Sequence, residues 1–426
     1  MISKNALVLT GGGARGAYQA GVLKAYVEML DEAGLPVPFS ILTGISAGSL
    51  NAAGLTSGID DPLHAVLRLA EFWAELKTSH VYRTDYPSLI ANAFRWGWDL
   101  FFGGLHHNTA ILSLVDTTPL RELIVRRLDF GDLHANLAAG RLEALALTSV
   151  DYESCDCVTF IESTAPHVAW TRVRRRSMEV KIEVDHLMAS AALPVVFPPV
   201  WIGNHYYGDG GLRNHSPLSP AIRLGADRIL VVGVHHRPAL HPRPPDAPVL
   251  RPTIARLASI AFNSIFLDAV EMDLERLQTR NELIRAHRCP RTPEEDTSKS
   301  ADKALAKSGN QPAASSPQVQ ASVPASVHAR DSLDPVYLRT VEYLYVTPSR
   351  DPALIALEHL NLLPRPIRYL VQGLGSESEG AEFVSYLLFE PPYLKALIAL
   401  GEEDARAQKA EILEVLSIAP EARHVI

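Results

Sequence analysis

A glycine cluster near the N-terminus has the spacing of an anion-binding loop. Gly11, Gly13 and Gly16 fit the pattern G-x-G-x-x-G. The apolar run at residues 7–9 is typical of a buried strand, and apolar residues recur at helical spacing from residue 17 onward. Glycines let the backbone turn sharply and leave its N–H groups open, and a helix N-terminus adds partial positive charge. We therefore expect this loop to hold an anion.

The sequence that follows disfavours a nucleotide as that anion. A dinucleotide fold needs an acidic residue at the end of its second strand, but the strand pattern at residues 39–43 runs into a second glycine-rich segment. A phosphate-binding P-loop would end in Gly-Lys-Ser or Gly-Lys-Thr, whereas this loop ends in Gly16-Ala17-Tyr18.

The second glycine-rich segment has the pattern of a nucleophile elbow. Gly44, Ser46 and Gly48 form G-x-S-x-G between a strand pattern and a helical pattern. The serine must stand at the tip of a tight turn, where side chains two residues before and after it would collide. A glycine-rich turn with an incidental serine is the alternative. Together with the upstream loop, the pattern favours a tetrahedral acyl intermediate whose oxyanion the Gly11–Gly13 backbone stabilises.

A serine nucleophile needs a base, and Asp209 is a specific candidate. It follows a strand-like run at residues 200–207 and precedes Gly210 and Gly211, which let another backbone approach its carboxylate. The alternative is an ordinary Asp-Gly turn.

The three motifs, in this order, resemble the patatin-like phospholipase family. The resemblance extends over most of the first 235 residues and includes the connecting stretches "DTTPLREL", "ASAALPVVFPPV" and "LGADRILVVGV". It implies a serine acyl hydrolase with a Ser-Asp dyad and a mostly parallel α/β sheet flanked by helices. The implied site has Ser46 as nucleophile, Asp209 as base, Gly44 and Gly48 around the elbow, Gly210 and Gly211 beside the base, and an oxyanion hole of Gly11, Gly12, Gly13, Arg15 and Gly16.

A carboxylate base needs a higher pKa than that of an aspartate in water. The pKa there is about 3.9, which is too low for efficient proton abstraction from a hydroxyl. Asp209 must be partly desolvated, or the helix that begins at Ser46 must assist the serine. A Ser-His-Asp triad is the alternative. Of the 16 histidines, His215 is the nearest in sequence to Asp209, and His235 with His236 ends a strand pattern.

Length and composition agree with a large α/β fold. The chain has 426 residues, of which 47% are hydrophobic, and strand and helix patterns alternate through its first half. We expect a catalytic domain at 1–285, a low-complexity linker or mobile loop at 286–334, and a returning strand with a helical region at 335–426. The helices of that last region either pack beside the sheet, form a dimer surface or line the acyl pocket.

Charge and cysteine content bear on partners and location. A net charge of −8 disfavours nucleic-acid binding, and the sequence has no run of 18 apolar residues. Residues 1–4 lead directly into a strand pattern, so we expect no signal peptide. The three cysteines, with Cys155 and Cys157 placed in a strand, form neither a disulfide framework nor a zinc pattern, which favours a cytoplasmic protein.

Two stretches bear on membrane contact. Residues 91–105 place four aromatic residues on one helical face, either as a core or cap helix or as an aromatic lip for lipid chains. The run "RVRRR" at 172–176 is either a solvated strand end or a contact for anionic head groups.

The sequence thus predicts an enzyme without cofactor or metal that hydrolyses acyl esters of phospholipids or lysophospholipids, with transient membrane contact. A non-catalytic lipid- or nucleotide-binding regulator is the alternative. No oligomeric state is predicted.

Overall fold

The computed structural model describes residues 4–83, 113–165, 169–237, 253, 268–288, 339–364, 368 and 377–416. Its strands are β1 (Asn5–Leu9), β2 (Phe39–Ile45), β3 (Ala144–Asp151), β4 (Cys157–Ser163), β5 (Thr171–Arg172), β6 (Arg175–Glu179), β7 (Val200–Ile202), β8 (His205–Asp209), β9 (Arg228–Val232) and β10 (Glu342–Val346). Its helices are η1 (Gly13–Arg15), α1 (Gly16–Glu32), α2 (Ala47–Ser57), α3 (Pro62–Glu75), α4 (Thr78–Val81), α6 (Thr118–Arg127), α7 (Phe130–Ala138), α8 (Val184–Ser190), η2 (Gly210–Leu212), α9 (Ser219–Leu224), α11 (Asp268–Arg288), α13 (Pro352–Glu358), η5 (Leu360–Leu362), α15 (Glu377–Leu387), α16 (Pro391–Ala407) and α17 (Lys409–Val415).

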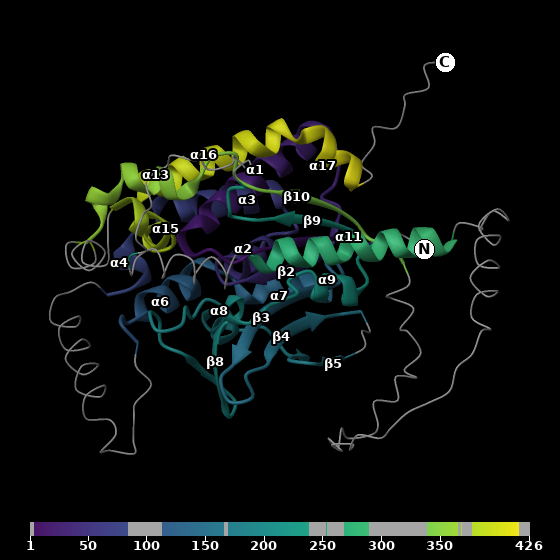
Figure 1. The fold of residues 1–426 in the computed structure, drawn as a ribbon, viewed down its shortest axis with the longest axis horizontal. Coiled ribbons are helices and arrows are strands. Elements are labelled where there is room, and N and C mark those ends of the chain that lie inside the picture. Colours follow the sequence, from purple (N-terminus) through teal and green to yellow (C-terminus); the bar gives the residue numbers. More distant parts are fainter. Residues whose placement is uncertain are drawn as a thin grey trace, which may run out of the picture. The chain divides into compact units, whose positions relative to one another are not determined.

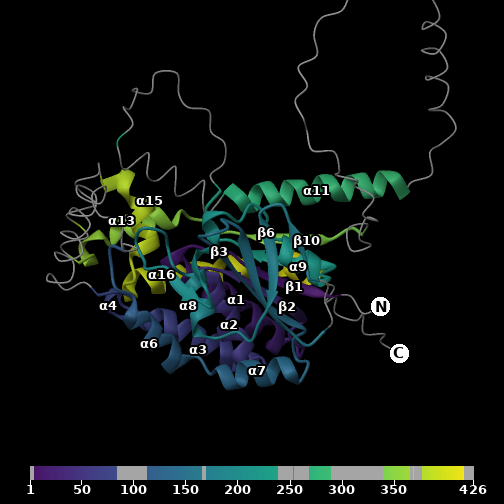
Figure 2. The same ribbon diagram turned by 90° about the horizontal axis from the view of Figure 1, so that it is seen from below.

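The strands form one sheet in the order β10-β9-β1-β2-β3-β4-β6-β5, with β8 beside β3 and β7 beside β8. The five strands from β10 to β3 are mutually parallel, and β4 and β8 pair antiparallel with β3. Helices α1, α2 and α3 gather on one face of this sheet, with α7 packed on α2 (Figure 2). The predicted α/β class, a mostly parallel sheet flanked by helices with a helical C-terminal region, is confirmed (Figure 1).

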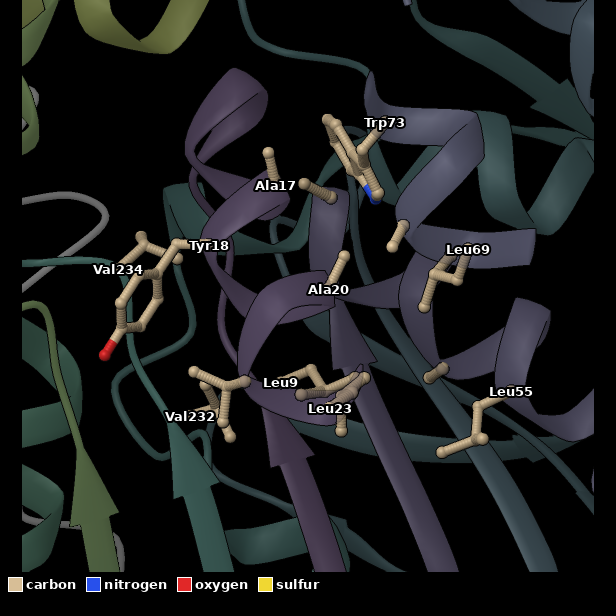
Figure 3. Packing of buried hydrophobic residues seen from close by; sticks show 14 of the residues in the cluster. Leu9, Ala17, Tyr18, Ala20, Leu23, Leu55, Leu69, Trp73, Val232 and Val234 are labelled. Carbon is tan, nitrogen blue, oxygen red and sulfur yellow. The ribbon is translucent and has the colours of Figure 1, made fainter. Parts of the chain in front are cut away.

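The main core lies between the parallel strands and the helices that cover them. Side chains from β1, β9, α1, α2 and α3 point into one cluster (Figure 3). Leu9, Leu23 and Val232 in this cluster are completely buried. Because burying a leucine side chain contributes about 1.5–3 kcal/mol, this cluster fixes the strand ends that carry the site.

Helix α16 packs closely on α1 through a glycine on each helix. A Cβ atom on Gly21 would stand 2.1 Å from the carbonyl oxygen of Ile398, and one on Gly401 would stand 2.2 Å from the carbonyl oxygen of Tyr18. The two glycines therefore let the backbones touch. This contact anchors the C-terminal helices to the helix that follows the glycine loop.

Two compact units divide the chain: Met1–Glu275 joined with Val341–Ile426, and Arg276–Thr340. All predicted site residues belong to the first unit. Strand β10 lies in its sheet, parallel to β9. Of the predicted linker 286–334, the structure describes residues 286–288 at the end of α11, and the rest lies outside the described residues.

Two local predictions need correction. Residues 200–207 form no single strand, because β7 and β8 make an antiparallel hairpin that turns at Gly203, which has a φ of 62°. Cys155 does not lie in a strand: its φ is 56°, in the turn that precedes Cys157 at the start of β4.

Of the two stretches considered for membrane contact, the structure describes one. Residues 91–105 lie outside the described residues, whereas "RVRRR" spans the turn between β5 and β6, where Val173 is exposed. Within the described ranges no single helix is long and apolar enough to cross a bilayer, and α15 with α16, bent by 93°, reaches that length only as a pair.

Candidate active site

Ser46 stands at a strained turn between β2 and α2. Its φ of 54° is unusual for a residue with a side chain, and it caps the N-terminus of α2. The residue is only 6% exposed, and it lines two small pockets. Strain of this kind persists only where the surroundings hold it, and it is common at active sites.

The flanking glycines allow this turn because side chains two residues before and after Ser46 would collide across it. A Cβ atom on Gly44 would lie 2.5 Å from the carbonyl oxygen of Gly48, across the turn. A Cβ atom on Gly48 would lie 2.3 Å from the carbonyl oxygen of Leu9 in β1. Any larger residue at either position would push the elbow off the sheet.

Ser190, at the end of α8, holds the backbone of the elbow through a hydrogen bond. The Ser46 N–H donates to Oγ of Ser190 at 3.0 Å, and this hydroxyl donates to the carbonyl oxygen of Thr148 at 2.7 Å. Ser190 is completely buried. Ser190 is not predictable as a site residue from the sequence, because a serine inside an apolar stretch has no pattern of its own.

Sheet register brings Asp209 to Ser46. Strand β4 occupies one edge of β3, and β2 and β8 follow one another along the other edge. On this edge Ile45 pairs with Thr148, and Asp209 pairs with the next residue, Ser149. Ser46, the residue after Ile45, therefore lies next to Asp209, where β2 ends and β8 takes its place.

The environment of Asp209 is suited to a base. Burial raises the pKa of its carboxyl from 3.8 to about 7, while interactions with the Ser46 hydroxyl and the Gly211 N–H oppose the rise. Oδ1 accepts from the Gly211 N–H at 2.8 Å, and the buried Oδ2 has no partner of full hydrogen-bond geometry among the described residues. Ser46 thus lies within interaction range of this carboxylate but short of an aligned hydrogen bond, as is common without substrate.

A close backbone contact fixes the position of the Asp209 turn. A Cβ atom on Gly210 would stand 2.3 Å from the carbonyl oxygen of Thr148. Only glycine permits the turn to lie this close to β3.

The glycine loop lies directly against the elbow. A Cβ atom on Gly11 would stand 3.1 Å from Cβ of Ser46, and Gly12, Gly13 and Ser46 line one pocket. In the described part of the chain, the N–H groups of Gly12 and Gly13 have no acceptor, as expected where η1 begins. Gly16, at the start of α1, packs against Ala47 beside the elbow.

Arg15 turns its side chain away from this pocket. It is completely buried: Nε donates to Oγ of Ser385 at 2.8 Å, and Nη2 donates to Oε1 of Glu382 at 2.7 Å. Its guanidinium also lies 4.3 Å from the ring centroid of Tyr386. The Arg15 side chain therefore packs against α15, and only the backbone of Arg15 lies at the glycine loop.

Residues far beyond the three motifs complete the pocket at Ser46. Tyr386, Leu387 and Phe389 form part of its wall, together with Leu193 and Phe197. From the sequence, lining the pocket is one of three alternative roles for the region 335–426. Helical periodicity shows that these helices are amphipathic but does not reveal which surface they cover.

The candidate histidines lie elsewhere. His236 bonds through Nδ1 to the carbonyl oxygen of Pro348 at 2.9 Å, and burial lowers the pKa of His235. His215 is exposed. Within the described ranges, no histidine lines the pockets that contain Ser46 or acts on the carboxyl of Asp209, and no cluster of three metal-ligating side chains occurs.

The chain combines a mostly parallel α/β sheet with a serine at a strained turn beside a glycine loop, and comparison with known families shows which family has this combination. The sequence profile of the patatin-like phospholipase family matches residues 7–222, just over half of the chain, and the chain belongs to this family. The resemblance stated from the sequence is thereby confirmed.

Individual relatives are distant. A probable lipid hydrolase, 463L, of Invertebrate iridescent virus 6 is 25% identical over 217 residues, which cover 51% of this chain and 63% of that protein. The chain thus spans less than two thirds of this relative. VipD from Legionella pneumophila aligns over 92% of this chain and 67% of its own, with 14% identity and a TM-score of 0.28. Human GIVD cytosolic phospholipase A2 aligns over 98% and 60%, with 12% identity and a TM-score of 0.39.

Proposed function

We propose that the protein is a lipid acyl hydrolase that cleaves carboxylic ester bonds of phospholipids or lysophospholipids. The observation that carries the proposal is the strained Ser46 beside the buried carboxylate of Asp209, whose pKa of about 7 suits a base at neutral pH. Family membership and a relative named as a probable lipid hydrolase support the substrate class. The apolar walls beside Ser46 fit an acyl chain.

The proposed reaction begins with proton transfer from Ser46 to Asp209. Oγ attacks the ester carbonyl carbon, and the carbonyl oxygen becomes an oxyanion that accepts from the N–H groups of Gly12 and Gly13. One such donor is typically worth about 10²–10³ in rate. The alkoxide then leaves with the proton from Asp209. Water, deprotonated by the same carboxylate, then attacks the acyl-serine. The Ser46 oxygen leaves with the proton that Asp209 returns to it, and the fatty acid is released.

The Ser46→Ala and Asp209→Asn variants test this proposal. We expect Ser46→Ala to lose both ester hydrolysis and covalent labelling by a fluorophosphonate, and Asp209→Asn to lose at least ~10²-fold in turnover, because an amide accepts no proton. Ser40→Ala, in the same strand β2 but at its opposite end, is the matched control and should retain full activity. Lipid binding by wild-type protein without labelling of Ser46 would instead favour the non-catalytic regulator.

For location we propose a cytoplasmic protein that meets membranes transiently, since the proposed substrates reside in bilayers. Cell fractionation tests this: we expect the protein in the cytosolic fraction, with a minor share on membranes. Exclusive recovery in an extracellular fraction would contradict the proposal.

A further inference from the structure

Two pockets on the helical side of the sheet share a wall. The inner pocket contains Ser46 and is lined by apolar side chains that include Leu50, Phe72, Trp73 and Leu120. The outer pocket is a separate, larger hollow whose lining also includes Leu50 and Phe72. These two side chains therefore stand between the space at the nucleophile and the larger hollow.

Helix α2 lines both pockets at successive turns. Ala47 and Leu50 face the inner pocket, whereas Leu50, Gly54 and Ser57 face the outer one. Because α2 starts at Ser46 and runs away from it, the outer pocket lies farther from the nucleophile along the same helix.

Helices α3 and α6 repeat this arrangement. On α3, Trp73 lines the inner pocket together with Leu76 just after the helix, and Leu69 lines the outer one. On α6, Leu120 lines the inner pocket and Ile124, one turn later, lines the outer one. Each of the three helices thus lines both pockets with neighbouring turns, which indicates that the two pockets are parts of one cleft.

The depth of this cleft corresponds to a long acyl chain. Gly54 and Ser57 lie eight and eleven residues after Ser46, roughly 12 and 16 Å along α2 at about 1.5 Å per residue. An extended alkyl chain advances roughly 1.3 Å per carbon, given a C–C bond of about 1.5 Å. A chain esterified at Ser46 therefore reaches the outer pocket after about nine to twelve carbons.

The chemistry of the walls agrees with a hydrocarbon. Leu69 and Ile124 are buried in the wall of the outer pocket, while Arg68 and Arg127 are exposed at its rim. Arg127 already pairs with Glu75 at 3.1 Å, so its charge is largely satisfied. The interior offers apolar contact, and the charged groups stay in solvent.

We propose that the two pockets form one acyl channel, with Leu50 and Phe72 as its constriction, and that the preferred substrates carry long acyl chains. This inference rests on the proposed hydrolase function. The end of the chain occupies the outer pocket between α2, α3 and α6, beyond the reach of a short acyl group.

Gly54→Leu tests the channel by filling the outer pocket. A Cβ atom on Gly54 would stand 3.2 Å from Cδ1 of Leu69, a flexible side-chain end that can shift. We expect kcat/KM for p-nitrophenyl palmitate to fall at least tenfold, because each buried methylene contributes about fourfold in binding. Turnover of p-nitrophenyl butyrate should stay within about twofold, which also shows that the variant is folded.

A second variant and a control guard against a folding artefact. Leu128→Trp narrows the outer pocket from the end of α6, at a half-buried position, and should produce the same selective loss. Leu67→Phe, at an exposed position on α3 outside both linings, should change neither rate. Equal losses for both esters, or no loss for palmitate, would overturn the channel. Wild-type protein that hydrolyses neither ester would instead refute the proposed hydrolase function.

Discussion

The guanidinium of Arg15 lies 2.7 Å from the carboxylate of Glu382, although 367 residues separate them in the chain. The arginine belongs to the glycine loop and the glutamate to α15, which leads into the pocket wall at Tyr386 and Leu387. Arg15 is fully buried and the Glu382 side chain is 17% exposed. The ion pair therefore ties the candidate oxyanion loop to a wall that lies outside the family match.

Removing one partner of this pair should destabilise the protein strongly. We expect Arg15→Gln to lower the free energy of unfolding by roughly 3–5 kcal/mol, since it leaves Glu382 poorly solvated and unpaired. Denaturant unfolding measures the loss. The matched control is Arg406→Gln, which removes an exposed ion pair to Glu28 on the neighbouring helices and should cost less than about 1 kcal/mol. Equal effects of the two substitutions would show that the Arg15 pair has no special role.

The pKa of Asp209 predicts how activity depends on pH. Because burial raises the pKa to about 7 and a base must be deprotonated, kcat/KM should rise with pH through about 7 and level off above it. A histidine base with a pKa of about 6.5 would produce nearly the same limb. The position of the limb therefore does not separate the two mechanisms, and the Asp209→Asn variant does.

Stability supplies the second measurement on Asp209. A carboxyl whose pKa is raised on folding binds its proton more tightly in the native state, so its contribution to stability is lost as pH rises from about 4 to about 7. Asp209→Asn has no such charge. Its stability relative to wild type should grow over this pH interval, by a few kcal/mol at pH above 7 and little near pH 4. A pH-independent difference between the two proteins would show that Asp209 is not desolvated in solution.

Ser190 should matter for catalysis although it does not contact substrate. In Ser190→Ala the buried N–H of Ser46 loses its acceptor, which costs about 1–3 kcal/mol and loosens the strained elbow. We expect kcat to fall about tenfold or more with little change in KM. Ser190→Thr keeps the hydroxyl and should restore most of the rate. Full activity of the alanine variant would show that α2 holds the elbow without help.

Gly13 should tolerate no side chain. Its φ is 54°, and a Cβ atom would stand 2.3 Å from the carbonyl oxygen of Tyr386, so Gly13→Ala must separate the loop from the wall. We expect loss of ester hydrolysis and a lower unfolding midpoint. Gly34→Ala is the control: its φ is 66° but no atom lies within 4 Å of the added Cβ, so only backbone strain of about 1–2 kcal/mol applies. Equal changes in activity and in unfolding midpoint for the two variants would mean that backbone strain, and not the contact with Tyr386, causes the loss.

Local sequence was sufficient for the elements that carry the candidate site. The strand before the glycine loop, the helix after it and the turn at Ser46 follow from apolar periodicity and glycine spacing, which act within a few residues. Cys155 and the hairpin at residues 200–207 were misplaced, because a turn at a positive φ inside a strand-like run leaves no periodic signal.

By itself the sequence thus determined the family and the fold class, and it predicted Ser46 as the nucleophile, since each depends on short-range patterns around Gly11, Ser46 and Asp209. Only the tertiary structure decided which surfaces meet. Asp209 reaches Ser46 through the register of β3, and Arg15 faces Glu382 because α15 packs directly against η1. Contacts of this kind join residues hundreds of positions apart. They result from packing of the whole core, which no local pattern encodes.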